Sequence, residues 1–128
     1  MTEIHQLGAG ELAAAIARGE ISSRAALDHY LARIETLGEP INAVVALDID
    51  AARQRADEAD AAIAAGQNWG PLHGVPMTIK DTYEVAGLPT VVGEPKLKDY
   101  RSSDDAVAVA RLRAAGAVIF GKSNTPRL

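Results

Sequence analysis

One lysine in this chain stands where a side chain can do acid–base chemistry. Residues 70–81 read GPLHGVPMTIKD, and Lys80 follows a short apolar segment directly. Glycine and proline make the first half a tight connection, and residues 75–79 predict a short buried strand that tolerates Pro76 near its start. A buried cation is costly unless it is paired or neutral, and burial favours the neutral form that acts as a base. Position alone favours the other interpretation, in which the Lys80 ammonium reaches solvent.

Cysteine and histidine, the other residue types considered for catalysis or metal binding, give no comparable candidate. The chain has no cysteine, which excludes disulfides, thiolate metal sites and a cysteine nucleophile. His5 and His29 are isolated in the sequence, without a partner at metal-ligand spacing, so we expect structural or surface roles and no metal site. We expect His73, inside GPLHG, to fix the turn through hydrogen bonds to the backbone.

Composition narrows the class of protein. At 128 residues the chain is long enough for one domain with a real core. A net charge of −4 argues against a general nucleic-acid binder or an anionic-membrane binder. The N-terminus lacks the regions of a signal peptide, and no apolar run approaches a membrane span. The default expectation is therefore a cytoplasmic protein.

Hydrophobic periodicity predicts an α/β protein with helices packed on a sheet. Helices are expected over about residues 9–19, 23–38, 49–65 and 105–115. Buried strands are expected over 41–47, 75–79 and 117–120, with a further short extended piece starting at 91. Either Ser22 or Ser23 can cap the second helix, and GEP at 38–40 should end it. Residues 1–66 are thus mainly helical and 67–128 form βα units, ending in a polar, turn-forming run at 121–128.

Several segments together resemble the amidase signature family. They are GPLHGVPMTIKD, the AGLPT that follows it, and DDAVAVARLRAAGAVIFGKSNTP, with the N-terminal helices before them. The resemblance covers essentially the whole chain and corresponds to the N-terminal part of that family's domain. It implies the N-terminal portion of the amidase signature fold, with helices on a mixed β-sheet, truncated before the family's Gly-Ser-rich catalytic segment.

The resemblance also implies a reaction, the hydrolysis of a carboxylic amide by a Ser-Ser-Lys triad without a cofactor. Lys80 matches the family's proton-relay lysine, and Ser123, Asn124 and Thr125 match a loop near its substrate pocket. A simple turn explains that loop about as well. The chain's serines are at positions 22, 23, 102, 103 and 123, and none lies in a Gly-Ser-Gly-Gly context. Without a nucleophile or an oxyanion hole, we expect the isolated chain to be inactive.

Three functions therefore remain open. The first is the N-terminal portion of an amidase that acts on a small-molecule amide. The second is the glutaminase-type A subunit of a tRNA-dependent amidotransferase, which shares the same signature. The third is a non-catalytic remnant whose unpaired sheet edge binds a second copy or a C-terminal half.

Overall fold

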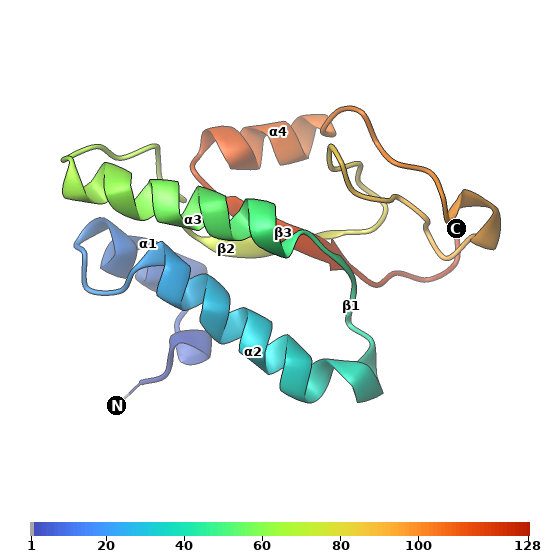
Figure 1. Cartoon of the computed structure of the whole chain (residues 1–128), viewed down its shortest axis with the longest axis horizontal. Coiled ribbons are helices and arrows are strands. Elements are labelled where there is room, and N and C mark those ends of the chain that lie inside the picture. Colours follow the sequence, from blue (N-terminus) through green and yellow to red (C-terminus); the bar gives the residue numbers. More distant parts are fainter. Residues whose placement is uncertain (1) are drawn as a thin grey trace.

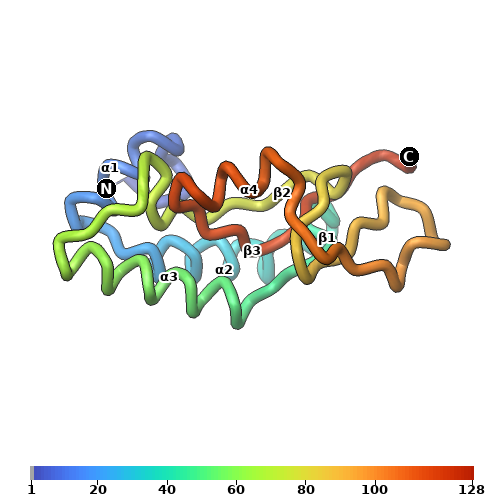
Figure 2. The backbone as a smooth tube through the Cα atoms, turned by 90° about the horizontal axis from the view of Figure 1, so that it is seen from above, coloured from blue at the N-terminus to red at the C-terminus, as the bar shows by residue number. Residues whose placement is uncertain are grey.

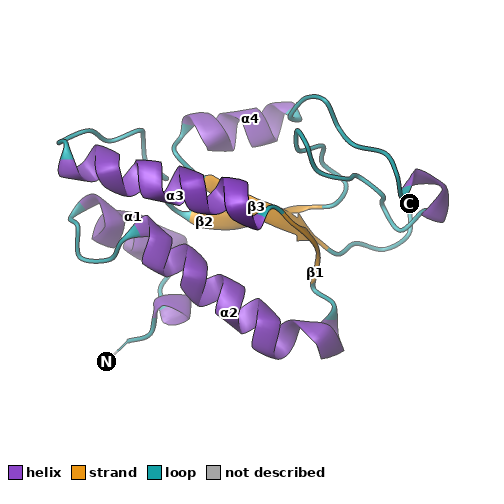
Figure 3. Ribbon diagram, in the orientation of Figure 1, coloured by secondary structure: helices purple, strands orange, loops and turns teal. Residues whose placement is uncertain are grey.

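The computed structural model describes residues 2–128, which form helices on both faces of a small sheet. Figures 1 and 3 show the elements in place. The α-helices are α1 (Ala9–Ala17), α2 (Ser23–Ile41), α3 (Ile49–Ala64) and α4 (Val107–Ala114). The strands are β1 (Val44–Leu47), β2 (Pro76–Lys80) and β3 (Val118–Ser123), and two short 3-10 helices are η1 (Ile4–Gln6) and η2 (Pro95–Leu97). The predicted α/β class is confirmed.

The sheet is mixed, with strand order β1-β3-β2. The central strand β3 runs parallel to β2 and antiparallel to β1. The parallel ladder contains a β-bulge: Met77 is paired with Ile119 but Thr78 with Gly121, so β3 has one residue more than β2 at this point. Beyond the bulge, Ile79 is opposite Lys122 and Lys80 is opposite Ser123.

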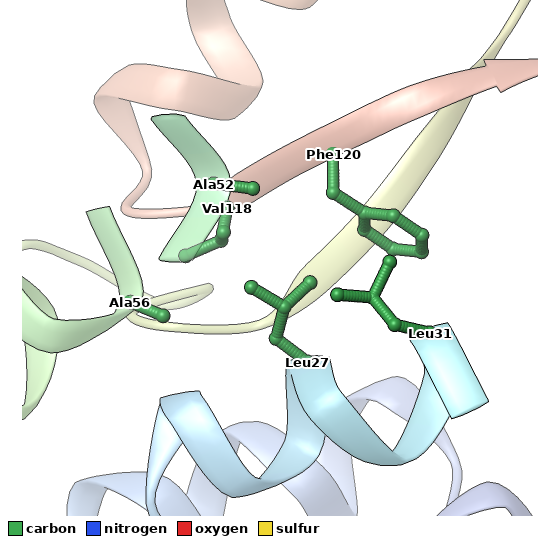
Figure 4. Close-up of a cluster of buried hydrophobic side chains, with 6 residues drawn as sticks. All are labelled: Leu27, Leu31, Ala52, Ala56, Val118 and Phe120. Carbon is green, nitrogen blue, oxygen red and sulfur yellow. The ribbon is translucent and has the colours of Figure 1, made fainter. Parts of the chain in front are cut away.

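Helices α2 and α3 lie side by side on one face of the sheet, and α4 covers the other (Figure 2). On the first face, leucines of α2 and small alanines of α3 pack against Val118 and Phe120 of β3; this cluster is drawn in Figure 4. On the second face, Val109 of α4 packs with Ile79 and Ile119. Side chains alternate along a strand, so β3 supplies both cores with successive residues.

Two expected boundaries at the end of the second helix are wrong. Helix α2 continues through Gly38 and Pro40 to Ile41, and the next residue, Asn42, adopts the left-handed conformation (φ 51°) and donates its N–H to the Gly38 carbonyl. Asparagine tolerates this conformation and can replace glycine at a helix end. The following strand therefore begins only at Val44, and it is an edge strand with Val45 42% exposed rather than a buried one.

The last strand is longer than expected, and α4 begins later. Residues 121–123, expected as a turn, continue β3 because β1 and β2 both pair with them. The helix expected from about residue 105 begins at Val107, since the Asp105 carboxylate accepts hydrogen bonds from the Ala86 N–H and the Arg113 side chain instead of capping α4. The extended piece expected at residue 91 is a turn. Within residues 2–128, no helix is both long and apolar enough to span a membrane.

The structure identifies the serine that caps α2. Ser22 Oγ accepts the Ala25 N–H at 2.9 Å, whereas Ser23 is buried and donates its hydroxyl to the Gly74 carbonyl at 2.6 Å. Ser22→Ala should lower the free energy of unfolding by about 1 kcal/mol, the typical effect of losing an N-cap. Ser103→Ala, at an exposed loop position, should change it by less than about 0.5 kcal/mol. Urea denaturation of both variants measures the difference, and equal effects would contradict the cap.

Candidate active site

Lys80 is the last residue of β2, at the carboxyl end of the strand, where its backbone is paired with Ser123 of β3. Its side chain is exposed, as the interpretation favoured by its position expects, and the alternative of a buried lysine is wrong. Strand alternation explains the exposure: Ile79 faces the α4 core, and Lys80 points to the opposite side of the sheet. Among residues 2–128, no acidic side chain forms an ion pair with Lys80.

The buried lysine is Lys122, which sequence reasoning missed. Its side chain is 0% exposed and forms an ion pair with Asp81, whose side chain is 6% exposed, at 3.0 Å. Lys122 Nζ also donates to the Pro89 carbonyl at 2.9 Å and to Thr90 Oγ1 at 3.1 Å. An ammonium has three N–H donors, and these three acceptors match them. One signal in the sequence could have indicated a buried cation: Asp81, an acidic residue directly after the buried strand, needs a positively charged partner.

Asp81 connects the sheet to the loop between β2 and α4. Its N–H donates to the Ser123 carbonyl at 3.0 Å, which extends the parallel ladder by one residue. Its Oδ2 accepts the N–H groups of Val91 at 3.3 Å and Val92 at 2.9 Å. Val92 has φ 53°, a conformation that β-branched residues rarely adopt. The carboxylate therefore holds a strained turn against the end of the sheet.

Of the predicted residues 123–125, Ser123 is opposite Lys80, and the side chains of Asn124 and Thr125 are already engaged in hydrogen bonds. Ser123 is the last residue of β3, while Asn124 donates from Nδ2 to the Asn42 carbonyl at 3.0 Å. Asn124 Oδ1 accepts the Thr125 N–H at 2.9 Å, and Thr125 Oγ1 donates to the Pro126 carbonyl. The contacts among Asn124, Thr125 and Pro126 are those of a turn, and the bond to Asn42 fixes this turn to the end of α2. Asn124 and Asp81 also line a groove of about 260 Å³ at this end of the sheet.

The GPLHG turn lies at the other end of β2 and has a structural role, as expected for His73. The Trp69 N–H donates to His73 Nδ1 at 2.9 Å, which places the ring proton on Nε2, 2.9 Å from the Ala59 carbonyl. The Arg55 guanidinium lies over the Trp69 ring in a cation–π contact, with its Cζ 4.3 Å from the ring centroid. Burial lowers the pKa of Arg55. The turn thus joins α3 to the start of β2.

Two further histidines are not isolated in the structure. His5 Nδ1 lies 2.8 Å from His29 Nε2, and the rings stack with centroids 5.1 Å apart. The pair connects η1 to α2, so the expectation of structural roles stands while that of isolation is wrong. Within residues 2–128, no group of three or more His, Asp or Glu side chains is arranged to hold a metal ion.

Comparison with known proteins assigns the chain to a family. The model of the family described as Amidase matches residues 25–128, which is most of the sequence. The chain belongs to the amidase family. The matched region contains all three strands and Lys80, Asp81 and Lys122, so the site at the end of the sheet is part of the family's domain.

Amidase-family relatives resemble the chain over nearly its whole length. It is 41% identical to an acylamidase of Rhodococcus erythropolis, over 98% of this chain and 27% of the relative. It is 40% identical to the A subunit of the glutamyl-tRNA(Gln) amidotransferase of Salinispora tropica, over 97% of this chain and 25% of the relative. The solved peptide amidase of Stenotrophomonas maltophilia superposes with a TM-score of 0.88 at 37% identity, over 95% of this chain and 25% of the other. The chain spans about a quarter of the length of these relatives.

Proposed function

We propose that residues 1–128 are the N-terminal portion of an amidase that hydrolyses carboxylic amides, and that Lys80 is its proton relay. The observation that carries the proposal is the placement of Lys80 in the Amidase match: it ends β2 at the carboxyl edge of the sheet, beside Ser123. Its exposed side chain has no ion-pair partner among residues 2–128 and is free to meet further residues there.

The proposed reaction needs two serines that this sequence does not provide. Neutral Lys80 takes a proton from a bridging serine, which takes one from the nucleophilic serine as its oxygen attacks the amide carbonyl. Returning the proton to the leaving nitrogen releases ammonia or an amine, and water then hydrolyses the acyl-serine to the acid. The five serines of the chain lie outside any Gly-Ser-Gly-Gly context, so we propose that the isolated chain has no activity.

A chimera tests this function directly. Residues 1–128 would replace the matched segment of the Rhodococcus acylamidase, which is 41% identical to them. We expect the chimera to release ammonia from a panel of simple primary amides, and the 128-residue chain to release none. A chimera that melts cooperatively but turns over no amide would contradict the proposal. Turnover by the 128-residue chain alone would show that a different nucleophile operates.

A second candidate is the glutaminase-type A subunit of a tRNA-dependent amidotransferase. It is supported by relatives of that name at 39% to 44% identity, similar to the identity with the acylamidase. The same residue, Lys80, would serve, but the substrate would be glutamine. Replacing the matched segment of the Salinispora protein with residues 1–128 and assaying glutamine hydrolysis separates the two candidates. Activity in this background and not in the acylamidase background would favour the amidotransferase.

A further inference from the structure

The Asp81–Lys122 pair lies next to the proposed relay on both strands. Asp81 follows Lys80 in the chain, and Lys122 precedes Ser123, which is opposite Lys80. Asp81 follows Lys80 and therefore faces the α4 side with Ile79, while Lys122, beyond the bulge, is opposite Ile79 and bonded to Asp81. The pair is thus on the α4 side of the sheet and Lys80 is on the other. The Asp81 carboxylate is therefore one residue from Lys80 in the chain but on the opposite face of the sheet.

Every polar side-chain atom of the pair is already engaged. The Lys122 ammonium has three acceptors, among them Asp81 Oδ1. Asp81 Oδ2 accepts two backbone N–H groups. Among residues 2–128, Arg55 Nε is the only buried side-chain nitrogen or oxygen without a hydrogen-bond partner, and Arg55 belongs to α3 and not to this pair. The charge of the Asp81 carboxylate is therefore neutralised by Lys122, and both of its oxygens have hydrogen-bond partners within the protein.

We propose that Asp81 and Lys122 are positioning residues for Lys80. Lys122 neutralises the adjacent carboxylate, so that no uncompensated negative charge holds a proton on Lys80. The pair also fixes the carboxyl ends of β2 and β3, from which Lys80 and Ser123 extend. This inference rests on the proposed role of Lys80 as a proton relay, because only a relay must lose its proton to work.

The charge state of Lys80 can be measured in the 128-residue chain without any activity. The chain has four lysines, so pulse acylation followed by mass spectrometry resolves each one, with exposed Lys96 and Lys98 as internal references. Lys122→Met leaves the Asp81 charge uncompensated and should slow Lys80 acylation about three- to tenfold, since Coulomb attraction favours the charged form. The variant D81N/K122M removes both charges, keeps an acceptor for Val91 and Val92, and should acylate Lys80 at the wild-type rate.

The outcomes separate this proposal from the function on which it rests. In the acylamidase chimera, Lys122→Met should move the rising limb of the pH–rate profile to higher pH by about half to one unit, and D81N/K122M should restore it. A uniform loss of kcat/KM without such a shift would overturn the positioning role. If Lys122→Met does not fold, D81N/K122M still decides: Lys80 acylation that differs from wild type by more than twofold overturns the proposal. An inactive wild-type chimera with the acylation pattern as expected would contradict the proposed function alone.

Discussion

Replacing Lys80 by alanine in the acylamidase chimera should lower kcat by about four orders of magnitude or more, the effect of removing one member of a coupled catalytic triad. The bridging serine would then have no group to take its proton. Because Lys80 is exposed and has no ion-pair partner among residues 2–128, its removal should leave the free energy of unfolding nearly unchanged. Steady-state ammonia release and urea denaturation measure the two effects separately.

Two matched variants sharpen this prediction. Lys80→Arg keeps the positive charge but cannot lose its proton, so it should be as inactive as Lys80→Ala. Lys96→Ala removes another exposed lysine, from η2, and should leave kcat within about twofold, as expected of a surface substitution. An active Lys80→Arg chimera would rule out proton transfer by Lys80 and leave only an electrostatic role.

Replacing Gly116 by alanine should destabilise the chain by about 3 kcal/mol or more, enough to unfold a marginally stable domain. Gly116 has φ +104°, and a Cβ there would lie 2.6 Å from His73 Cα and 2.8 Å from His73 N. These atoms are backbone and cannot move aside alone. The Gly74 N–H donates to the Gly116 carbonyl at 2.9 Å, so any shift of this turn also strains the GPLHG segment.

Two other glycines separate the cost of the positive φ from the cost of the close approach to His73. Gly66 also has a positive φ, +78°, but an added Cβ meets nothing within 4 Å, so Gly66→Ala should cost only about 1–2 kcal/mol. Gly10 lies inside α1 with open space around it, and Gly10→Ala should stabilise the chain by about 0.5–1 kcal/mol. Chemical denaturation of the three variants gives the order. A Gly116→Ala variant no less stable than Gly66→Ala would show that the close approach to His73 is not rigid.

Local patterns were sufficient for much of the fold. Within residues 2–128, the spacing of apolar residues located the four α-helices to within a few residues, because each buries one face, and a short apolar run located β2. The end of α2 was misjudged because proline usually stops a helix, yet Pro40 lies in its last turn, so the single backbone hydrogen bond that its missing N–H removes is at the very end of the helix, two residues before Asn42.

The site was harder to predict because it depends on contacts between distant segments. Gly-Lys-Ser-Asn at 121–124 has the composition of a turn, and only pairing with β1 and β2 on both sides makes most of it a strand. The burial of Lys122 requires acceptors at residues 81, 89 and 90, and local sequence patterns do not predict contacts between segments so far apart. Lys80 was singled out by its position after a buried strand and by resemblance to a family; its exposure agrees with the interpretation favoured by position, and the alternative of burial was wrong.

The bulge in β3 has a consequence for which lysine meets which neighbour. If the ladder continued in phase from Met77–Ile119, Lys80 would be paired with Lys122 and Asp81 with Ser123. Two ammonium groups would then repel each other on one face, and the carboxylate would be left without a cation on the other. The single extra residue in β3 exchanges these neighbours. A backbone irregularity, and not a change of side chain, thus sorts the charges at the end of the sheet.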